Sequence, residues 1–183
     1  ISIDIQQVSN DSYLKSYKVM GWYYNNDGVG LMRDSIVEDS FIRTNDDSIK
    51  LQYGSNNSAL NNVIWQLFNG GCYQIGWQGN GCIDCIVNNT DIIHAEWRNA
   101  QQPNNAVIDL RTPYIIFENK QRYYKNITFE NMRIDSSVGR IVGIKFDDVQ
   151  NGYESIMDGI YLSNVEMTNA LAWYDMNNET GPD

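Results

Sequence analysis

Short runs of β-branched and aromatic residues recur along this chain, and each run closes in Asn, Asp or Gly. The clearest runs are residues 35–42, 62–69, 83–89, 126–131 and 159–164. Inside a run, apolar and polar residues alternate with the two-residue period of a strand. Repeats of this size that close in turn residues are typical of solenoids, in which each rung covers the edge of its neighbour. The sequence therefore predicts an all-β fold, a right-handed parallel β-helix.

The alternation also predicts which side chains fill the interior of this helix. We expect them to be Ile36, Phe41, Val63, Leu67, Ile86, Ile127, Phe129, Ile160 and Leu162. A sandwich of antiparallel hairpins is the alternative all-β fold. It would place Asn-Gly or Asp-Gly turns between paired strands, and such dipeptides are only scattered along the chain.

We assign residues 1–183 to one β-helix domain with a loop excursion at about 98–125, where the rung period breaks. The excursion is expected to carry strands of its own near residues 107–110 and 114–117. Long excursions often wall a binding cleft. The chain opens on Ile1 rather than Met and stops at Asp183, so we expect it to be a fragment of a longer protein. Its open rungs would need a cap, a neighbouring domain or end-to-end self-association.

The charge balance excludes some classes of partner. A formal net charge of −10 argues against nucleic acid, which requires clustered Lys and Arg, and against an anionic polysaccharide such as pectin. The 12 Tyr and 5 Trp suit a neutral polysaccharide, whose sugar faces stack on aromatic rings. An acidic surface that keeps an extracellular protein in solution explains the charge equally well. No apolar run reaches the roughly 18 residues of a membrane span, so we expect no membrane contact.

Five Asn-x-Ser/Thr sequons support secretion and predict N-glycans. They begin at Asn10, Asn56, Asn88, Asn126 and Asn178.

Three cysteines, Cys72, Cys82 and Cys85, allow one disulfide whose connectivity the sequence leaves open. A zinc site from these cysteines and His94 is the alternative, although buried cysteines in neighbouring rungs explain the same spacing. We expect no metal and no cofactor.

Three acids fall about one rung apart and form the candidate catalytic site. Asp27 follows two Asn residues, and Asp46 and Asp47 form a vicinal pair. Rungs of about 20–25 residues, stacked about 4.8 Å apart, bring the three onto one face. Cleaving a glycosidic bond with inversion needs a protonated carboxyl as acid and an ionised carboxylate to activate water. Crowding should raise at least one pKa, so that a proton remains available near neutral pH.

A family resemblance rests on four segments that match together and in order. They are 19–29, with Asp27-Gly28; 41–51, with Asp46-Asp47-Ser48-Ile49-Lys50; 73–77, with Ile75-Gly76-Trp77; and 91–97, with His94-Ala95-Glu96-Trp97. These segments resemble glycoside hydrolase family 49, the dextranases and isopullulanases. The likeness covers residues 17–98, while residues 99–183 match only as a generic β-helix, and the β-sandwich that precedes the helix in that family is absent here.

The resemblance implies an inverting endo-hydrolase of α-glucans, with Asp46 as general acid and Asp27 and Asp47 positioning water. Adjacent residues on a strand face opposite ways, so Asp46 and Asp47 can serve one cleft only if residues 45–47 lie at a bend. Ile49 then points inward, and Lys50 points outward near the acids, where it tempers their repulsion or binds a sugar hydroxyl. An ordinary surface ion pair explains Lys50 nearly as well.

Aromatic residues near these segments are the candidate sugar-stacking groups. They are Trp77, Tyr24, Tyr53 and Trp97, although packing within or between rungs explains any one of them at least as well. Polygalacturonases share the fold and a similar acid triple. Where they carry Gly-His-Gly, this chain has Gly76-Trp77-Gln78, and an aromatic ring in place of an imidazole suits a neutral sugar.

The alternative function is a non-catalytic β-helix module that binds glycan or forms part of an extracellular fibre or coat. In that interpretation the three acids are only a solvated edge. Open β-helices stack end to end readily when their caps are missing. The complete acid triple favours the enzyme.

Overall fold

The regular secondary structure of the described residues consists of β-strands, joined by turns and bends. A computed structural model describes residues 8–23, 25–67, 69–76, 81–96, 106–112, 121–136, 138–146 and 154–168. Its strands are β1 (Tyr13–Lys15), β2 (Lys18–Met20), β3 (Val29–Met32), β4 (Ile36–Glu38), β5 (Phe41–Thr44), β6 (Ile49–Ser55), β7 (Ser58–Leu60), β8 (Val63–Leu67), β9 (Tyr73–Gln74), β10 (Gly81–Glu96), β11 (Ile108–Thr112), β12 (Gln121–Ile134), β13 (Val142–Phe146) and β14 (Glu154–Met167). These residues include no helix of the length and apolarity that a membrane span requires.

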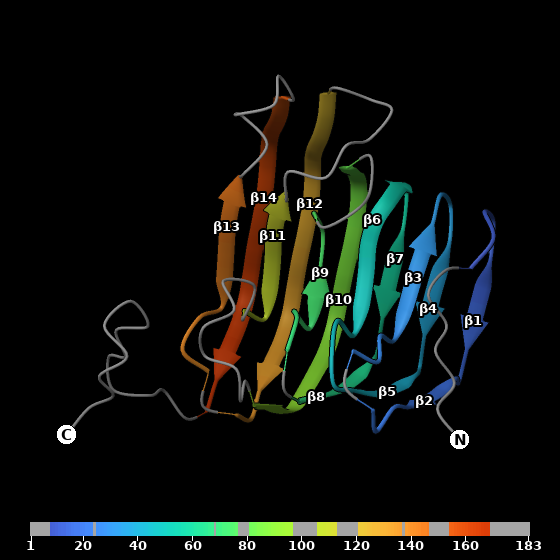
Figure 1. The fold of residues 1–183 in the computed structure, drawn as a ribbon, viewed down its shortest axis with the longest axis vertical. Helices are drawn as coiled ribbons and strands as arrows, with labels where there is room; N and C mark the ends of the chain where they lie inside the picture. Colours follow the sequence, from blue (N-terminus) through green and yellow to red (C-terminus); the bar gives the residue numbers. More distant parts are fainter. Residues whose placement is uncertain are drawn as a thin grey trace.

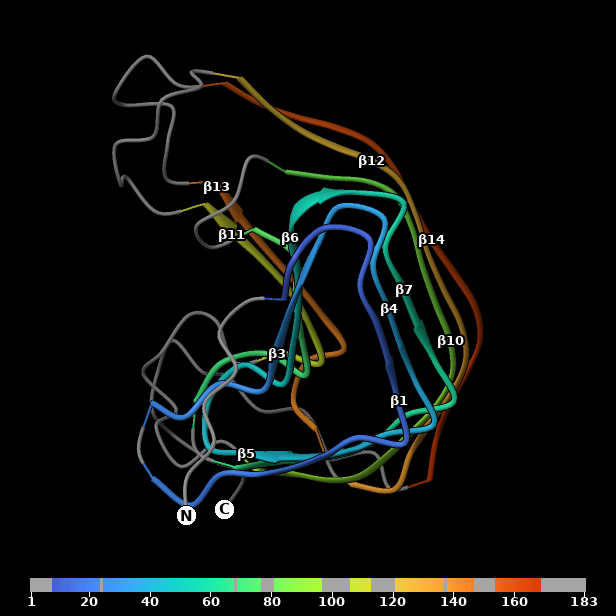
Figure 2. The same ribbon diagram turned by 90° about the vertical axis from the view of Figure 1, so that its right-hand side faces the viewer.

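The strands stack in parallel as three columns around one interior, which confirms the predicted parallel β-helix. The first column contains β3, β6, β9, β11 and β13. The second contains β1, β4, β7, the middle of β10, β12 and β14. The third contains β2, β5, β8 and the end of β10. Figure 1 shows the strands side by side, and Figure 2, turned by 90°, shows how they enclose the interior.

Side chains in register from one rung to the next form the core. In the first column Val29, Ile49, Tyr73 and Ile108 are aligned and fully buried. The ring of Tyr73 meets Phe129 of β12 edge-on, with centroids 5.6 Å apart, and so joins the first column to the second. Edge-on aromatic pairs contribute about 0.5–1.5 kcal/mol beyond the burial of their area.

The predicted interior faces are partly wrong, by one residue. The buried stacks contain Val37, Ile42, Ile64, Val87 and Phe129. Phe129 and Ile127 were predicted correctly, but Ile36, Phe41, Val63 and Ile86 lie on the opposite side of their strands. A one-residue slip moves every side chain of a strand to the other face. The slip arose because these strands carry apolar residues at adjacent positions.

Leu162 was predicted to be interior but is exposed, because it lies on the last described strand of its column. Leu162 is aligned with buried Phe129, yet it is 43% exposed. Among the described strands, β14 pairs only with β12, so no further rung covers its side chains. Ile160 and Leu67, also predicted to be interior, are partly buried.

Asn and Asp at the corners explain why each apolar run closes in these residues. Asp34, Asn56, Asp84 and Asn126 all have φ between 50° and 58°, the left-handed region that Asn and Asp tolerate better than other non-Gly residues. Their side chains form hydrogen bonds up the corner: the Asn56 amide donates to Asp34 and the Asn126 amide to Asp84, each at 2.8 Å. Two of the predicted N-glycan sites, Asn56 and Asn126, are therefore exposed corner residues.

Part of the expected loop excursion lies inside the coil. The strand expected near residues 107–110 is β11, and it pairs in parallel with β9 and β13 rather than in a loop of its own. The second strand expected, near residues 114–117, lies outside the described residues. The bounds of the excursion stay a prediction.

Candidate active site

A sharp bend between two columns carries two of the three acids. β5 ends at Thr44 and β6 begins at Ile49, so residues 45–48 turn the chain within four positions. The Thr44 hydroxyl donates to the Asp46 carbonyl and also hydrogen-bonds the Ser48 hydroxyl, both at 2.8 Å. This satisfies the condition derived from the sequence, because at a bend adjacent side chains need not face opposite ways.

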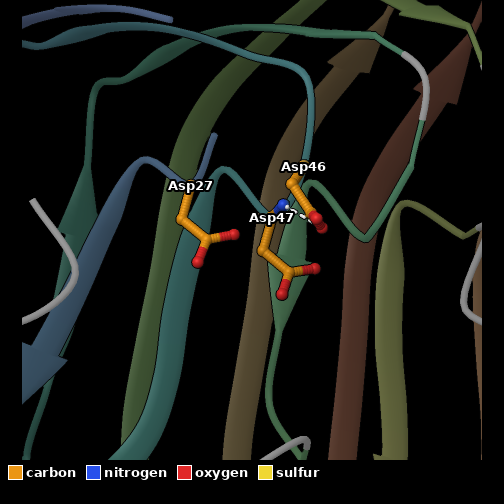
Figure 3. A group of neighbouring side chains, drawn as sticks. All are labelled: Asp27, Asp46 and Asp47. Carbon is orange, nitrogen blue, oxygen red and sulfur yellow. Dashed lines mark hydrogen bonds between the residues drawn. The ribbon is translucent and has the colours of Figure 1, made fainter. Parts of the chain in front are cut away.

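The third acid reaches the same place from the preceding rung. Asp27 lies directly before Gly28 and β3, and the Gly28 amide donates to the Asp47 carbonyl at 2.8 Å. One carboxyl oxygen from each of Asp27, Asp46 and Asp47 lies within 4.8 Å of the others. Figure 3 shows the three side chains close together, Asp27 on one rung and Asp46 and Asp47 on the next.

The surroundings of Asp46 favour the protonated form of its carboxyl. Burial and the neighbouring charge of Asp27 raise the pKa of its carboxyl to about 6. Hydrogen bonds from the Asp47 amide to Oδ1 and from the Asn69 amide to Oδ2, both at 2.9 Å, act in the opposite direction but do not outweigh burial. A carboxyl with such a pKa is partly protonated in mildly acidic solution, which a general acid requires.

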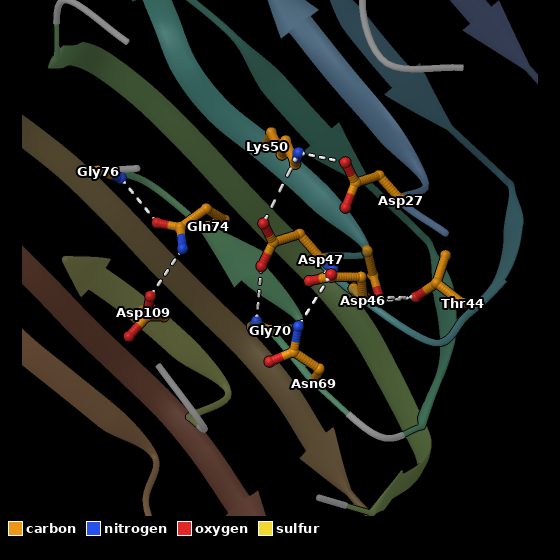
Figure 4. Close-up of polar contacts among 12 residues, drawn as sticks. Asp27, Thr44, Asp46, Asp47, Lys50, Asn69, Gly70, Gln74, Gly76 and Asp109 are labelled. Carbon is orange, nitrogen blue, oxygen red and sulfur yellow. Dashed lines mark hydrogen bonds and ion pairs between the residues drawn. The ribbon is translucent and has the colours of Figure 1, made fainter. Parts of the chain in front are cut away.

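Lys50 supplies the positive charge of the site. Its ammonium lies 2.5 Å from Asp27 Oδ2 and 3.7 Å from Asp47 Oδ2 (Figure 4). Asp47 is buried, and its Oδ1 accepts a hydrogen bond from the Gly71 amide at 2.8 Å. Burial still raises the pKa of Asp47, with Lys50 acting to lower it. The sequence placed Lys50 near the acids, and the structure brings it between two of them.

A second polar chain lies along the same column and was not singled out from the sequence. Gln74 of β9 is in register with Lys50, and Asp109 of β11 is in register with Gln74. The Gln74 amide donates to Asp109 at 2.7 Å and accepts from the Gly76 amide at 2.9 Å; all of these groups are buried (Figure 4). Gln74 lies in the rung quoted for the family likeness, and this was the only sequence signal for it.

Trp22 is an exposed aromatic residue whose backbone contacts the residue before the acid pair, and the sequence reasoning also missed it. Its carbonyl accepts a hydrogen bond at 3.0 Å from Asn45, the residue before Asp46. The Arg43 guanidinium lies over one face of the indole, 3.6 Å from the ring centroid, while the side chain stays 65% exposed. Its position in the segment that contains Asp27 could have indicated it.

The structure does not describe the side chains of the four residues predicted to stack on sugars. Tyr24, Trp77 and Trp97 lie outside the described residues, and only the backbone of Tyr53 is described, as part of β6. Their binding roles stay predictions.

The zinc alternative is wrong. His94 contacts Trp65, with ring centroids 5.5 Å apart, and lies 3.4 Å from Glu96. In the described part of the chain, the acid triple is the one group of His, Cys, Asp or Glu whose ligand atoms converge. The cysteines and His94 therefore do not form a metal site. The acid oxygens are hard ligands of the kind that Mg²⁺ and Ca²⁺ take, but Lys50 already supplies a cation to two of them.

Comparison with known proteins relates the chain to one group of enzymes. Over 127 aligned residues it is 29% identical to a dextranase of Arthrobacter globiformis, an alignment that covers 68% of this chain and 20% of the relative. The chain is similar in sequence to dextranases and to an isopullulanase. An isopullulanase of Aspergillus niger is 26% identical over 185 aligned residues, covering 88% of this chain and 31% of that protein.

Further comparisons give the extent of this relationship. A dextranase of Talaromyces minioluteus is 30% identical over 87 residues, covering 47% of this chain and 14% of that protein. No protein-family model matches the chain. The aligned part of the chain spans between about a seventh and a third of the length of these relatives.

Proposed function

We propose that this chain carries the catalytic site of a glycoside hydrolase that acts on a neutral α-glucan. The observation that carries the proposal is the convergence of Asp27, Asp46 and Asp47, with the pKa of Asp46 raised to about 6. The relationship to dextranases and an isopullulanase supports the same class of reaction. Asp46 is the general acid: its proton passes to the glycosidic oxygen as the bond to the anomeric carbon breaks.

Asp27 and Asp47 are the candidates for the base that activates water. The ammonium of Lys50 lies 2.5 Å from Asp27 Oδ2 and pairs this carboxyl group with a cation. We infer inversion at the anomeric carbon, with water attacking on the face opposite the leaving group. The nearest oxygens of the triple lie within 4.8 Å of one another, which is nearer the roughly 5–5.5 Å between the carboxyl groups of retaining enzymes than the roughly 6.5–9.5 Å of inverting ones. The inference of inversion therefore rests on the resemblance to the dextranases and isopullulanases and not on this spacing. The configuration of the anomer that is released first decides between inversion and retention.

The substrate is proposed to be a dextran- or pullulan-like polymer because the site offers groups suited to uncharged sugars. Trp22 exposes an indole whose other side is supported by Arg43, and exposed aromatic faces stack on the apolar faces of sugars. The net charge of −10 would repel a polyanion. A polysaccharide substrate is met outside the cell, which is consistent with the proposed secretion and with the N-glycans predicted at the exposed Asn56 and Asn126.

The test is incubation with dextran, pullulan or polygalacturonate, and the release of reducing ends measures hydrolysis. We expect hydrolysis of dextran or pullulan and none of polygalacturonate. Asp46→Asn should lower kcat by about 10²–10⁴-fold, because an amide cannot donate the proton. Asp34→Asn, at an exposed corner, is the matched control and should retain full activity.

Two outcomes would contradict the proposal. Wild-type turnover by Asp46→Asn would show that Asp46 is not the acid. An unmodified protein that binds glucan without releasing reducing ends would instead support the non-catalytic module. Proton NMR of the first product decides the stereochemistry, since retention of the anomeric configuration would rule out inversion without affecting the assignment of Asp46 as acid.

A further inference from the structure

We propose that Cys82 and Cys85 are a redox pair that oxidises to a disulfide, leaving Cys72 as a free thiol. The sequence allows three pairings of the three cysteines. In the structure the Sγ atoms of Cys82 and Cys85 are 2.6 Å apart, and both residues are fully buried as thiols. The inference concerns the β-helix itself and does not depend on the proposed enzymatic activity.

The backbone at a corner of β10 explains how these two sulfurs meet. On a straight strand, residues three apart point to opposite faces. Asp84 lies between the cysteines with φ 54° and turns the chain, so that both side chains enter the interior. The Asn126 amide holds this corner by donating to Asp84 at 2.8 Å. A turn brings residues i and i+3 within about 7 Å at their Cα atoms, which overlaps the roughly 4.4–6.8 Å of disulfides.

Cys72 lies elsewhere in the core. It directly precedes β9, and its carbonyl accepts a hydrogen bond from the Ile49 amide of β6 at 3.0 Å. No contact of its sulfur with either of the other cysteines is found among the described residues. Burial, with a smaller contribution from the charge of Asp47, raises the pKa of this thiol, so it is a poor nucleophile for exchange.

The pair has the complementary acidities that thiol–disulfide exchange uses. The hydrogen bond donated by Cys82 lowers the pKa of Cys85, while burial raises that of Cys82. During folding, before the core closes over the pair, the Cys85 thiolate attacks the disulfide of an oxidant such as oxidised glutathione and releases one thiolate. Cys82 then loses its proton and attacks the Cys85 sulfur of the mixed disulfide, releasing the second. Two protein thiols are oxidised to one disulfide, and the oxidant is reduced to two thiols.

The experiment counts thiols in the protein after refolding in a mixture of oxidised and reduced glutathione. The protein is then denatured, its free thiols are alkylated, and its intact mass and cysteine-containing peptides are analysed. We expect one alkylated thiol in the wild type, at Cys72, and a linked pair at Cys82 and Cys85. Cys72→Ser should show none, and either Cys82→Ser or Cys85→Ser should show two.

Three alkylated thiols in the refolded wild type, or a disulfide that includes Cys72, would overturn the proposal. The wild-type peptide map decides this even if a serine variant fails to fold. Reduction followed by a thermal melt gives a second measurement. The oxidised wild type should melt at a higher temperature than its reduced form, whereas Cys82→Ser should show no such difference.

Discussion

At the scale of single residues, the groups around Asp46 act on the pKa of its carboxyl in opposite directions. Burial and the charge of Asp27 favour the neutral carboxyl, whereas Lys50 and two hydrogen bonds favour the carboxylate. Burial dominates, because the charged form loses hydration that two hydrogen bonds only partly replace. The result is one acid that can hold a proton beside another that is paired with an ammonium.

The pH dependence of hydrolysis follows from this balance. Activity should fall as the pH rises through about 6, because Asp46 then loses the proton it must donate. Asp27→Asn removes the second largest influence that raises the pKa of Asp46, so the falling limb of residual activity should move to lower pH. Initial rates measured from pH 3 to 9 test both statements. A limb that stays at the same pH in Asp27→Asn would show that the two carboxyls do not interact.

At the scale of elements, the site depends on how closely the next rung approaches the bend at residues 45–48. Gly70, between β8 and β9, has φ 77° and lies directly against both acids. A Cβ at this position would contact Asp46 Oδ1 and would lie 2.5 Å from Asp47 Oδ1 and 2.6 Å from the Asp47 amide. Only a glycine fits both the left-handed conformation and this approach.

Gly70→Ala should therefore lower activity by at least tenfold and destabilise the protein by about 1–3 kcal/mol, since the strained conformation and the displaced acids both carry a cost. Gly139→Ala is the matched control, because no atom lies within 4 Å of the added Cβ. It should leave both quantities nearly unchanged. Reducing-end assays and urea denaturation measure the two effects. Equal behaviour of the two variants would show that the bend tolerates displacement.

At the scale of the whole molecule, keeping these carboxyls in a partly dry site costs stability. The pKa of Asp46 in the folded protein, about 6, lies above its ordinary value of 3.8. The folded state therefore binds more protons than the unfolded state between these values, and the free energy of unfolding falls as the pH rises through this window. Burial raises the pKa of Asp47 as well, so its contribution has the same sign.

Asp46→Asn should relieve part of this cost. Its stability relative to the wild type should increase from pH 4 to pH 7 by on the order of 2–3 kcal/mol, because the amide carries no charge to bury. Urea denaturation at several pH values measures the difference between the two proteins, which cancels the titration of surface carboxyls. A difference that does not change with pH would contradict the raised pKa of Asp46.

The sequence by itself determined the β-helix, the corners and the convergence of the acids. A strand period and turn residues are local properties, and Asn or Asp at positive φ, as at Asn56 and Asn126, leaves a direct mark in the sequence. Because one rung returns the chain to the same face, residues separated by about one rung, such as Asp27 and Asp47, could be placed together without coordinates.

Only the tertiary structure decided which face each strand buries, which sulfurs meet and what surrounds the acids. Ile36 and Val37 are both apolar, so local pattern could not choose between them, and register with the neighbouring rungs did. The meeting of Cys82 with Cys85 depends on the backbone turn at Asp84. Gln74 and Asp109 meet only because β9 and β11 stack. Such contacts depend on packing between residues that are far apart in sequence and lie on neighbouring rungs. The periodicity within one rung does not predict them.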